Sequence, residues 1–403
     1  MVAFIIFLKL SDLCCILYSV PQKGDLVMNV PSEFLCHPTV FAIGDTYQII
    51  TPVKSEMLFW VKIGDKKYFD HSNGIMRSAT RVHKVVVPMT ALDSVGEYTV
   101  CYKNMLDRKP YFPESEDTAE FTYKFKPVVK GSPIKLYHVA DSHGRAYDAI
   151  EAAKTAFGED TDLLVLNGDI SDHSSSVENI SMIYRIASGI TEGAKPCVYA
   201  RGNHDMRGAF AEHLAEYTPT THGDGLTYFT FRLGDLWGLV LDCAEDKLDT
   251  DKEYGGTVCC HSYREAETEF LKQIADSKEF EGAKYKAVIC HAPFTYRDKG
   301  SNGIFDIEND IYAEWVRILN ENIKPDLMLA GHTHICAISQ PDGEMDDYGQ
   351  SFPVVIGARP QAINGESGFT GTAFVFDGEL INTEFTDSSG NKKPCALINI
   401  KRG

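Results

Sequence analysis

Polar residues that can bind metal ions or move protons gather in five short clusters along the chain. The clusters are Asp141-Ser142-His143, Gly168-Asp169, Gly202-Asn203-His204-Asp205, His291, and Gly331-His332-Thr333-His334. Each cluster follows a short apolar run that predicts a buried strand. In open α/β sheets, ligands bind at the edge formed by the carboxyl ends of the strands. We therefore expect these residues, far apart in the sequence, to form one site that holds two metal ions.

The residue types in these clusters indicate which metals the site would take. Asp, Asn and His offer oxygen and nitrogen ligands that suit Mn, Fe or Zn. A carboxylate shared by two cations can hold them about 3.5–4 Å apart, the spacing used in phosphoryl chemistry. Asp169 is the candidate bridge, because Gly168 lets the backbone turn sharply before it. Asp141 and His143 lie two residues apart, which favours chelation from one loop, and the last cluster repeats that spacing.

The elements that must position these clusters alternate between strand and helix from residue 134 onward. We expect strands at 136–140, 163–166, 196–200, 287–290 and 327–330, helices at 147–157, 177–188, 207–217, 263–275 and 311–321, and hairpins within 228–241 and 374–385. This alternation predicts an α/β fold. We assign residues 134–390 to this domain and residues 391–403 to a C-terminal tail.

The preceding segment, residues 25–128, is rich in β-formers and turn residues. Short strands are expected at 47–50, 57–61, 82–87, 97–101 and 121–125. Such a run of strands predicts an all-β, immunoglobulin-like sandwich domain. Residues 127–133 are expected to form a hinge. Residues 1–24 are expected to be a poorly ordered extension or a mis-assigned gene start. A signal peptide is the alternative, although the segment has no basic n-region and no clear cleavage site.

Composition limits the classes of partner. The 403 residues include 44% hydrophobic and 24% charged residues, as in soluble globular proteins. The net charge of −18 argues against a grip on long nucleic acid, but not against small phosphorylated substrates. No apolar run reaches the roughly 18 residues of a membrane helix, so no membrane association is expected. The sequence gives no indication of the oligomeric state.

Eleven cysteines occur at irregular spacing, and none of them forms a CxxC pair. Several lie in or next to apolar runs, as Cys197, Cys243 and Cys290 do. This pattern favours small buried hydrophobic residues in a reducing compartment, and hence a cytoplasmic protein. A few disulfides in a secreted protein are the alternative.

The order of the five clusters resembles the calcineurin-like metallophosphoesterase superfamily. The match runs over about residues 134–385 and consists of Asp-x-His, Gly-Asp, Gly-Asn-His-Asp, His and Gly-His-x-His. It implies a two-sheet α/β/β/α sandwich, here preceded by a β domain as in purple acid phosphatases. Two residues depart from that last group: Asp172 stands where it has a tyrosine, and it has no histidine at the position of His143. A ferric–tyrosinate chromophore is therefore not expected.

The resemblance also implies roles for single residues. One metal would be bound by Asp141, His143 and His334, the other by Asn203, His291 and His332, and Asp169 would join both. His204 would face the substrate, with Asp205 as its orienting partner. As an alternative, Asp205 would only cap the helix that follows. Further candidates for substrate contact are Lys247, Tyr254, Arg297 and Lys299, which could equally belong to solvated loops.

The implied activity is hydrolysis of phosphate ester bonds in small molecules, as a phosphatase or a phosphodiesterase. A metal-bound hydroxide would attack phosphorus while His204 assists the leaving oxygen. The cofactors would be two divalent or trivalent ions of Mn, Fe or Zn. A nuclease or nucleotide phosphohydrolase is one alternative. A non-catalytic binding protein with a vestigial phosphoesterase domain is another.

Overall fold

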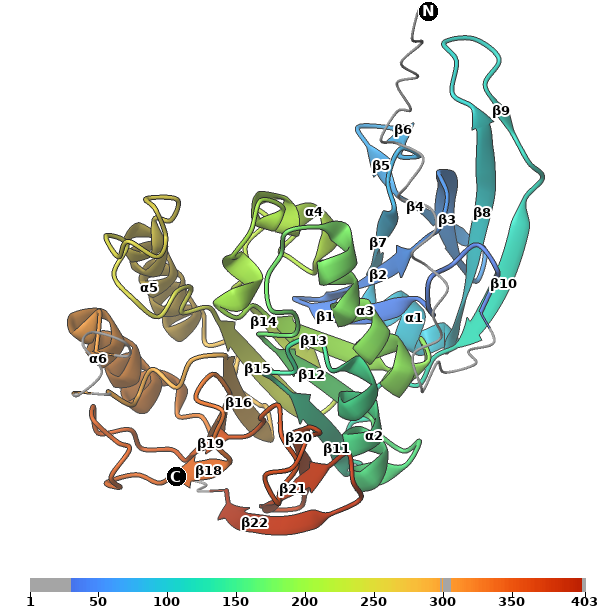
Figure 1. Ribbon diagram of the computed structural model, residues 1–403. Helices are drawn as coiled ribbons and strands as arrows, with labels where there is room; N and C mark the ends of the chain where they lie inside the picture. The colour runs from blue at the N-terminus through green and yellow to red at the C-terminus, as the bar shows by residue number, and fades with distance from the viewer. Residues whose placement is uncertain (1–29, 298, 300–305, 401–403) are drawn as a thin grey trace, which may run out of the picture.

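The computed structural model describes residues 30–297, 299 and 306–400, so the extension expected at 1–24 lies outside the described residues. Two large sheets form its centre (Figure 1). The nine-stranded sheet has the order β22 (Lys392–Asn399), β21 (Leu380–Asp387), β20 (Thr370–Asp377), β11 (Ile134–Val139), β12 (Leu163–Asn167), β13 (Pro196–Ala200), β1 (Thr39–Ile43), β2 (Thr46–Pro52) and β7 (Val82–Pro88). The six-stranded sheet has the order β14 (Phe229–Leu233), β15 (Leu236–Leu241), β16 (Tyr285–Cys290), β17 (Leu327–Ala330), β19 (Val354–Ile356) and β18 (Ala337–Ser339).

Helices cover the outer faces of these two sheets. α2 (Ala146–Phe157) and α3 (Val177–Thr191) pack on the nine-stranded sheet, and α5 (Cys260–Ser277) and α6 (Asn309–Ile318) pack on the six-stranded sheet. A short π-helical segment, Leu319–Ile323, follows α6. Between the sheets, Leu136 and Val165 of one share a buried core with Ile289 and Leu329 of the other. The predicted α/β fold is confirmed, with layers in the order helix, sheet, sheet, helix.

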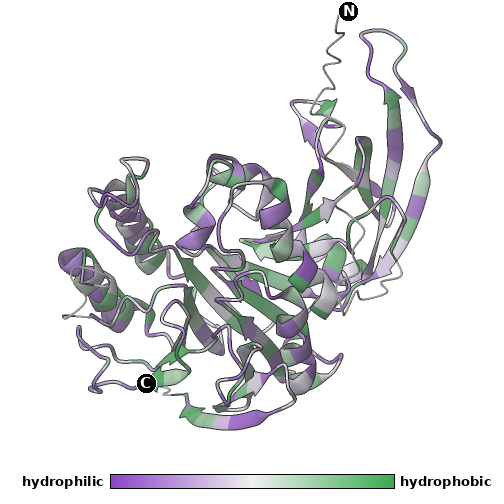
Figure 2. Cartoon of the chain, viewed as in Figure 1, coloured by the Kyte–Doolittle hydropathy of each residue, from purple (hydrophilic) through white to green (hydrophobic). Residues whose placement is uncertain are grey.

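The sequence pattern of these elements explains the layering. Strands β12, β13 and β15 are buried along their whole length, as expected for strands covered on both faces. Figure 2 shows the central strands as mostly hydrophobic and the helices as mixed, because a covering helix buries only one face. Ser176 caps the N-terminus of α3, because its side chain accepts a hydrogen bond from the Asn179 backbone N–H. Among the described residues, no helix is both long enough and apolar enough to cross a membrane.

The immunoglobulin-like domain expected at 25–128 is not confirmed. Its strands are divided between two sheets. β3 (Met57–Ile63), β4 (Lys66–Phe69), β8 (Glu97–Asp107), β9 (Glu114–Ser115) and β10 (Ala119–Lys124) form a separate five-stranded sheet, β5 (His71–Ser72) pairs with β6 (Ile75–Met76), and Met89–Val95 form helix α1. β1, β2 and β7 instead continue the nine-stranded sheet, because β1 pairs in parallel with β13.

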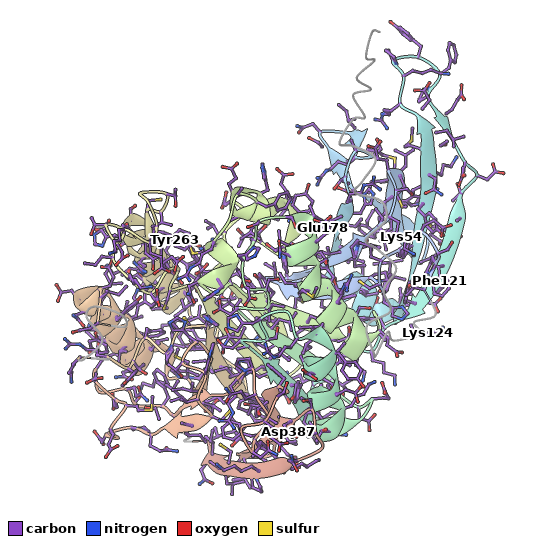
Figure 3. All side chains as sticks on the ribbon, in the orientation of Figure 1. Lys54, Phe121, Lys124, Glu178, Tyr263 and Asp387 are labelled. Carbon is purple, nitrogen blue, oxygen red and sulfur yellow. The ribbon has the colours of Figure 1, made fainter. Side chains whose placement is uncertain are left out.

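The core follows this arrangement. Phe59 and Val100 of the five-stranded sheet share one buried cluster with Ile49 and Val85 of the nine-stranded sheet, and that cluster extends into the space between the two large sheets. The expected boundary near residues 128–134 therefore does not separate two sheets. In Figure 1, β8, β9 and β10 extend away from the rest of the molecule, and Figure 3 places Phe121 and Lys124 on that outer edge.

Two further expectations differ from the structure. Residues 392–399, assigned to a tail, form β22 at the edge of the nine-stranded sheet. The helix expected at 207–217 is reduced to the short elements His204–Met206, Ala211–His213 and α4 (Leu214–Tyr217). Gly208 has a left-handed φ of 109°, and the backbone of Ser174 bonds to both Arg207 and Phe210, which keeps residues 207–210 out of a helix.

Candidate metal centre

The five polar clusters all follow strands of the two central sheets. Asp141, Asp169 and Asn203 come after β11, β12 and β13, which are neighbours in the nine-stranded sheet. His143 shares the loop of Asp141, whereas His291 comes after β16 and the pair His332 and His334 comes after β17, its neighbour in the six-stranded sheet. Because β11, β12 and β13 pair in parallel, as do β16 and β17, each set of side chains emerges at one edge of its sheet.

The first group of potential ligands consists of Asp141, His143 and His334. The Nε2 atoms of the two histidines lie 3.0 Å apart, and Nε2 of His334 is 3.4 Å from Oδ1 of Asp141. Nδ1 of His143 lies 2.9 Å from a carboxylate oxygen of Asp172. When Nδ1–H donates to this carboxylate, Nε2 keeps its lone pair for a metal.

The second group consists of Asp169, His291 and His332. Nε2 of His291 lies 3.2 Å from Oδ2 of Asp169 and 3.8 Å from Oδ1 of Asp141, so His291 joins the two groups. Nδ1 of His291 lies 2.6 Å from the carbonyl oxygen of Asn167. A carbonyl only accepts, so Nδ1 carries the hydrogen and Nε2 faces the site.

Asn203, the seventh expected ligand, is buried beside these groups. The N–H of the next residue, His204, donates to Oδ1 of Asp169 over 2.9 Å, which ties this turn to the second group. Within the described part of the chain, Oδ1 of Asn203 has no hydrogen-bond partner. A buried amide oxygen without a partner is costly, and a metal ion would satisfy it. The donor set and this oxygen both fit a transition-metal site.

The backbone of the site is strained in a consistent way. Asp141, His143, Asp169, His332 and His334 all have positive φ values, from 45° to 68°. Non-glycine residues rarely adopt this left-handed conformation, and such outliers gather at functional sites. Close packing adds to the constraint: a Cβ atom on Gly331 would lie 2.5 Å from Oδ2 of Asp141, and one on Gly202 would lie 2.3 Å from Oδ1 of Asp169.

Electrostatics link the buried acids and histidines. Burial opposes the charged form of His291, but the Asp169 and Asp141 carboxylates outweigh it and raise its pKa to about 10. Burial and the charge of His291 lower the pKa of His332 to about 4. Burial would raise the pKa of Asp169, yet the charge of His291 holds it well below its usual range. The carboxylates therefore attract positive charge to this place, which is also what a metal ion brings.

The expected pairing of His204 with Asp205 differs from the structure. One carboxylate oxygen of Asp205, Oδ2, accepts backbone N–H bonds from Gly202 over 2.9 Å and from Asp169 over 3.1 Å. Burial and the Asp169 carboxylate raise the pKa of Asp205 to about 6. Nδ1 of His204 instead donates to the carbonyl oxygen of Asp172 over 2.9 Å. Asp205 thus fixes the loops of Asp169 and Asn203, while the Asp172 carbonyl orients His204.

The loop after β15 borders the site. Arg207, which contacts this loop, was not among the functional residues predicted from the sequence. Asp246 lies 3.7 Å from Nε2 of His332 and accepts a hydrogen bond from Tyr254, one of the expected substrate contacts. Arg207, which was predicted to begin the helix at 207–217, instead contacts Glu245 of this loop and His204. The sequence does hold one indication of a role for Arg207, which is its position three residues after His204.

Other candidates for substrate contact are held in ion pairs. Arg297 pairs with Asp306, and Lys299 pairs with Asp347. Lys247 pairs with Glu253 and Asp246. Arg201, next to Gly202, is half-buried between Asp242 and Tyr263, a residue of α5 that Figure 3 labels.

Comparison with known proteins agrees with this fold and site. The family model of calcineurin-like phosphoesterases matches residues 134–336, half of the chain. The chain therefore belongs to the calcineurin-like phosphoesterase family, as the motif order predicted. It is a metallophosphoesterase, a hydrolase that acts on phosphate esters. No curated protein matches the sequence.

Two solved structures were compared with this chain. The purple acid phosphatase PPD1 from yellow lupin (Lupinus luteus) seeds has a TM-score of 0.56 and 13% identity, over 90% of this chain and 74% of that chain. A structure of PhoD has a TM-score of 0.49 and 13% identity, over 93% of this chain and 94% of that chain. At such identity the likeness to the purple acid phosphatase shows the fold alone.

Proposed function

We propose that this protein is a dinuclear-metal hydrolase that cleaves phosphate esters of small molecules. The observation that carries the proposal is the position of Asn203 Oδ1, which is buried beside two groups of Asp and His ligands and lacks a partner among the described residues. In this proposal Asp141, His143 and His334 hold one ion. Asn203, His291 and His332 hold the other, and Asp169 touches both.

The metals and the protein contribute different chemistry. Two bound cations of Mn, Fe or Zn would neutralise phosphate oxygens and lower the pKa of a bound water. The buried carboxylates and the histidines with fixed Nδ1 hydrogens set the positions of the ligand atoms. The strained backbone keeps those positions before any ligand arrives, so little reorganisation is needed during the reaction.

His204 is proposed as the proton donor to the leaving oxygen. The carbonyl of Asp172 accepts from Nδ1, so Nε2, which lies 3.4 Å from Nη1 of Arg207, is the ring nitrogen that would face the substrate. A proton held at Nε2 would neutralise charge on the departing alkoxide. Asp205 supports this arrangement indirectly, because it binds the backbone that carries Asp169 and Asn203.

We further propose a cytoplasmic location. All nine cysteines in the described ranges are free, and most of them are buried. Cys243 and Cys290 lie with their sulfur atoms 3.3 Å apart without a disulfide, as in a reducing compartment.

The test is turnover of a chromogenic phosphate monoester and a diester by the full-length protein after reconstitution with Mn²⁺. We expect activity from the wild type and a loss of both activity and one ion per chain in His332→Ala, measured by elemental analysis. The matched control is His222→Ala, outside the ligand set. A reconstituted wild type that binds two ions but cleaves neither substrate would contradict the proposal and favour a binding protein.

A further inference from the structure

Arg207 lies beside the substrate-facing histidine. Its Nη1 atom is 3.4 Å from Nε2 of His204, and its side chain is 26% exposed. A substrate oxygen that bonds to Nε2 of His204 would therefore also come within reach of the guanidinium. A guanidinium suits phosphate because its N–H groups form a planar fork.

The backbone under Arg207 is fixed. The Ser174 N–H donates to the Arg207 carbonyl over 2.6 Å, and the Phe210 N–H donates to the Ser174 carbonyl over 3.0 Å. Gly208, with its left-handed φ, lies against this loop so closely that a Cβ atom would be 2.6 Å from Oγ of Ser175. Arg207 is thus presented from a constrained turn, which limits the positions open to its side chain.

One edge of the guanidinium is permanently occupied. Nε and Nη2 donate to the two carboxylate oxygens of Glu245 over 2.9 Å and 2.8 Å. The Glu245 side chain is only 1% exposed, so the carboxylate of this bidentate pair is buried while the guanidinium reaches the surface. The pair leaves Nη1 as the edge that faces His204.

An exposed acid, Glu253, shares that remaining edge. Oε1 of Glu253 is 3.4 Å from Nη1 of Arg207, and Oε2 of the same carboxylate is 2.9 Å from Nζ of Lys247. The Glu253 side chain is 45% exposed, so its pairing with Arg207 is weak and readily exchanged. If another anion takes Nη1, Glu253 keeps its bond to Lys247.

We propose that Nη1 of Arg207 binds a non-bridging oxygen of the substrate. Until the substrate arrives, the Glu253 carboxylate occupies the place of that oxygen beside Nη1. Arg207 and Glu253 together make the site selective for phosphomonoester dianions. This inference rests on the proposed function and specifies its substrate class. A monoester has three non-bridging oxygens and a diester has two. An additional cationic donor on the protein therefore favours the monoester, whose third oxygen carries charge and can accept from it.

The test compares p-nitrophenyl phosphate with bis(p-nitrophenyl) phosphate on the metal-loaded, full-length protein. Arg207→Gln alone would strand the buried Glu245 carboxylate, so the double variant Arg207→Gln/Glu245→Gln is measured beside it. We expect both to lose about 10- to 100-fold in monoester kcat/KM, as for one charge-assisted hydrogen bond, and to lose less than about threefold with the diester. Glu253→Gln should lower the monoester KM by about two- to fivefold, since an exposed ion pair is weak.

The matched control is Arg317→Gln, which removes another bidentate Arg–Glu pair, with Glu314 on α6. It should leave both rates unchanged. Equal losses on monoester and diester in the double variant would overturn the proposal, as would an unchanged monoester rate or a higher monoester KM in Glu253→Gln.

Binding of inorganic phosphate, measured by calorimetry on the same proteins, separates this inference from the proposed function. Binding that weakens in the double variant and tightens in Glu253→Gln supports the anion site even if the wild type cleaves nothing. In that case the proposed hydrolysis fails and the binding site stands. Phosphate affinity that is equal in all variants overturns the anion site.

Discussion

The nine-stranded sheet brings two kinds of connection to the same edge. β11, β12 and β13 run parallel, and their carboxyl ends lead into the loops of Asp141, Asp169 and Asn203. β1 lies parallel to β13 in the adjacent position, but it ends in the tight turn of Gly44 and Asp45 and returns as antiparallel β2. One half of the edge carries the candidate metal centre and the other half carries a hairpin.

The difference teaches what a site requires beyond a sheet edge. A parallel strand must be followed by a crossover, whose first residues are free to point functional side chains outward. A hairpin turn uses its few residues to reverse the chain. Left-handed φ values occur in both halves, but they fall on Asp and His in one and on Gly44 in the other. In the first half, the residues with left-handed φ include candidate metal ligands, and in the second half the left-handed residue is a glycine of the hairpin turn.

The largest effect should come from the proposed bridging carboxylate. Asp169→Asn should lose both ions and more than about 1,000-fold in kcat/KM, because Lewis-acid stabilisation is worth several kcal/mol. The control is Asp45→Asn, an exposed acid in the hairpin turn at the same edge. Elemental analysis and kinetics measure both. A variant that keeps two ions would remove the bridging role.

His204 should separate catalysis from metal binding. His204→Ala should keep its metal content and lose about 100-fold in kcat on substrates with poor leaving groups, as for a lost general acid. Substrates with good leaving groups should lose less, because their departing oxygen needs no proton. The measurement is kcat against leaving-group pKa. Loss of metal in this variant would instead make His204 a ligand.

A pair of glycine substitutions compares the two halves directly. Gly331→Ala puts a Cβ atom 2.5 Å from Oδ2 of Asp141 and should weaken metal binding by about 10- to 100-fold. Gly44→Ala meets nothing within 4 Å, but its φ of +57° should cost about 1 kcal/mol of stability and leave activity intact. Metal titration and thermal unfolding distinguish the two effects. Similar metal affinities would show that the close approach is not required.

The smallest effect concerns the pH dependence of stability and comes from His138, a buried histidine in β11, the strand that leads to Asp141. Burial lowers the pKa of His138 to about 4, and its Nε2 lies 3.0 Å from Nδ2 of Asn167. The unfolded chain binds this proton below about pH 6.5, while the folded chain does not until about pH 4. Stability should therefore fall as the pH falls through this window. His138→Asn should show a shallower decline in the free energy of unfolding between about pH 6.5 and pH 4. A decline as steep as that of the wild type would exclude His138 as its cause.

The sequence was sufficient where the signal was local. An apolar run followed by Gly-Asp or Gly-His-x-His placed the strand ends, and six of the seven expected ligands lie in the two Asp–His groups, with Asn203 beside them. It was insufficient where pairing was non-local. β1 and β2 are buried along nearly their whole length, which is typical of strands covered on both faces, but such an apolar run does not specify β13 as the pairing partner.

Single side chains were hardest to assign. Asp205 looked like a partner for His204, yet its carboxylate bonds to backbone N–H groups that only the folded loops bring near it. Arg207 looked like the start of a helix, because the bonds from Ser174 that keep it extended come from a segment more than thirty residues away. Such contacts depend on tertiary structure and leave no periodic signal.

The parallel pairing of β1 with β13 has a consequence for dissecting the molecule. A fragment that begins at β11 would leave β13 as an exposed edge strand, with unpaired backbone groups and an apolar face. Such an edge recruits other chains, so the fragment should aggregate rather than report on the catalytic half. β1 protects the edge of β13 by pairing with it, so experiments on the phosphoesterase half require a chain that includes the N-terminal strands.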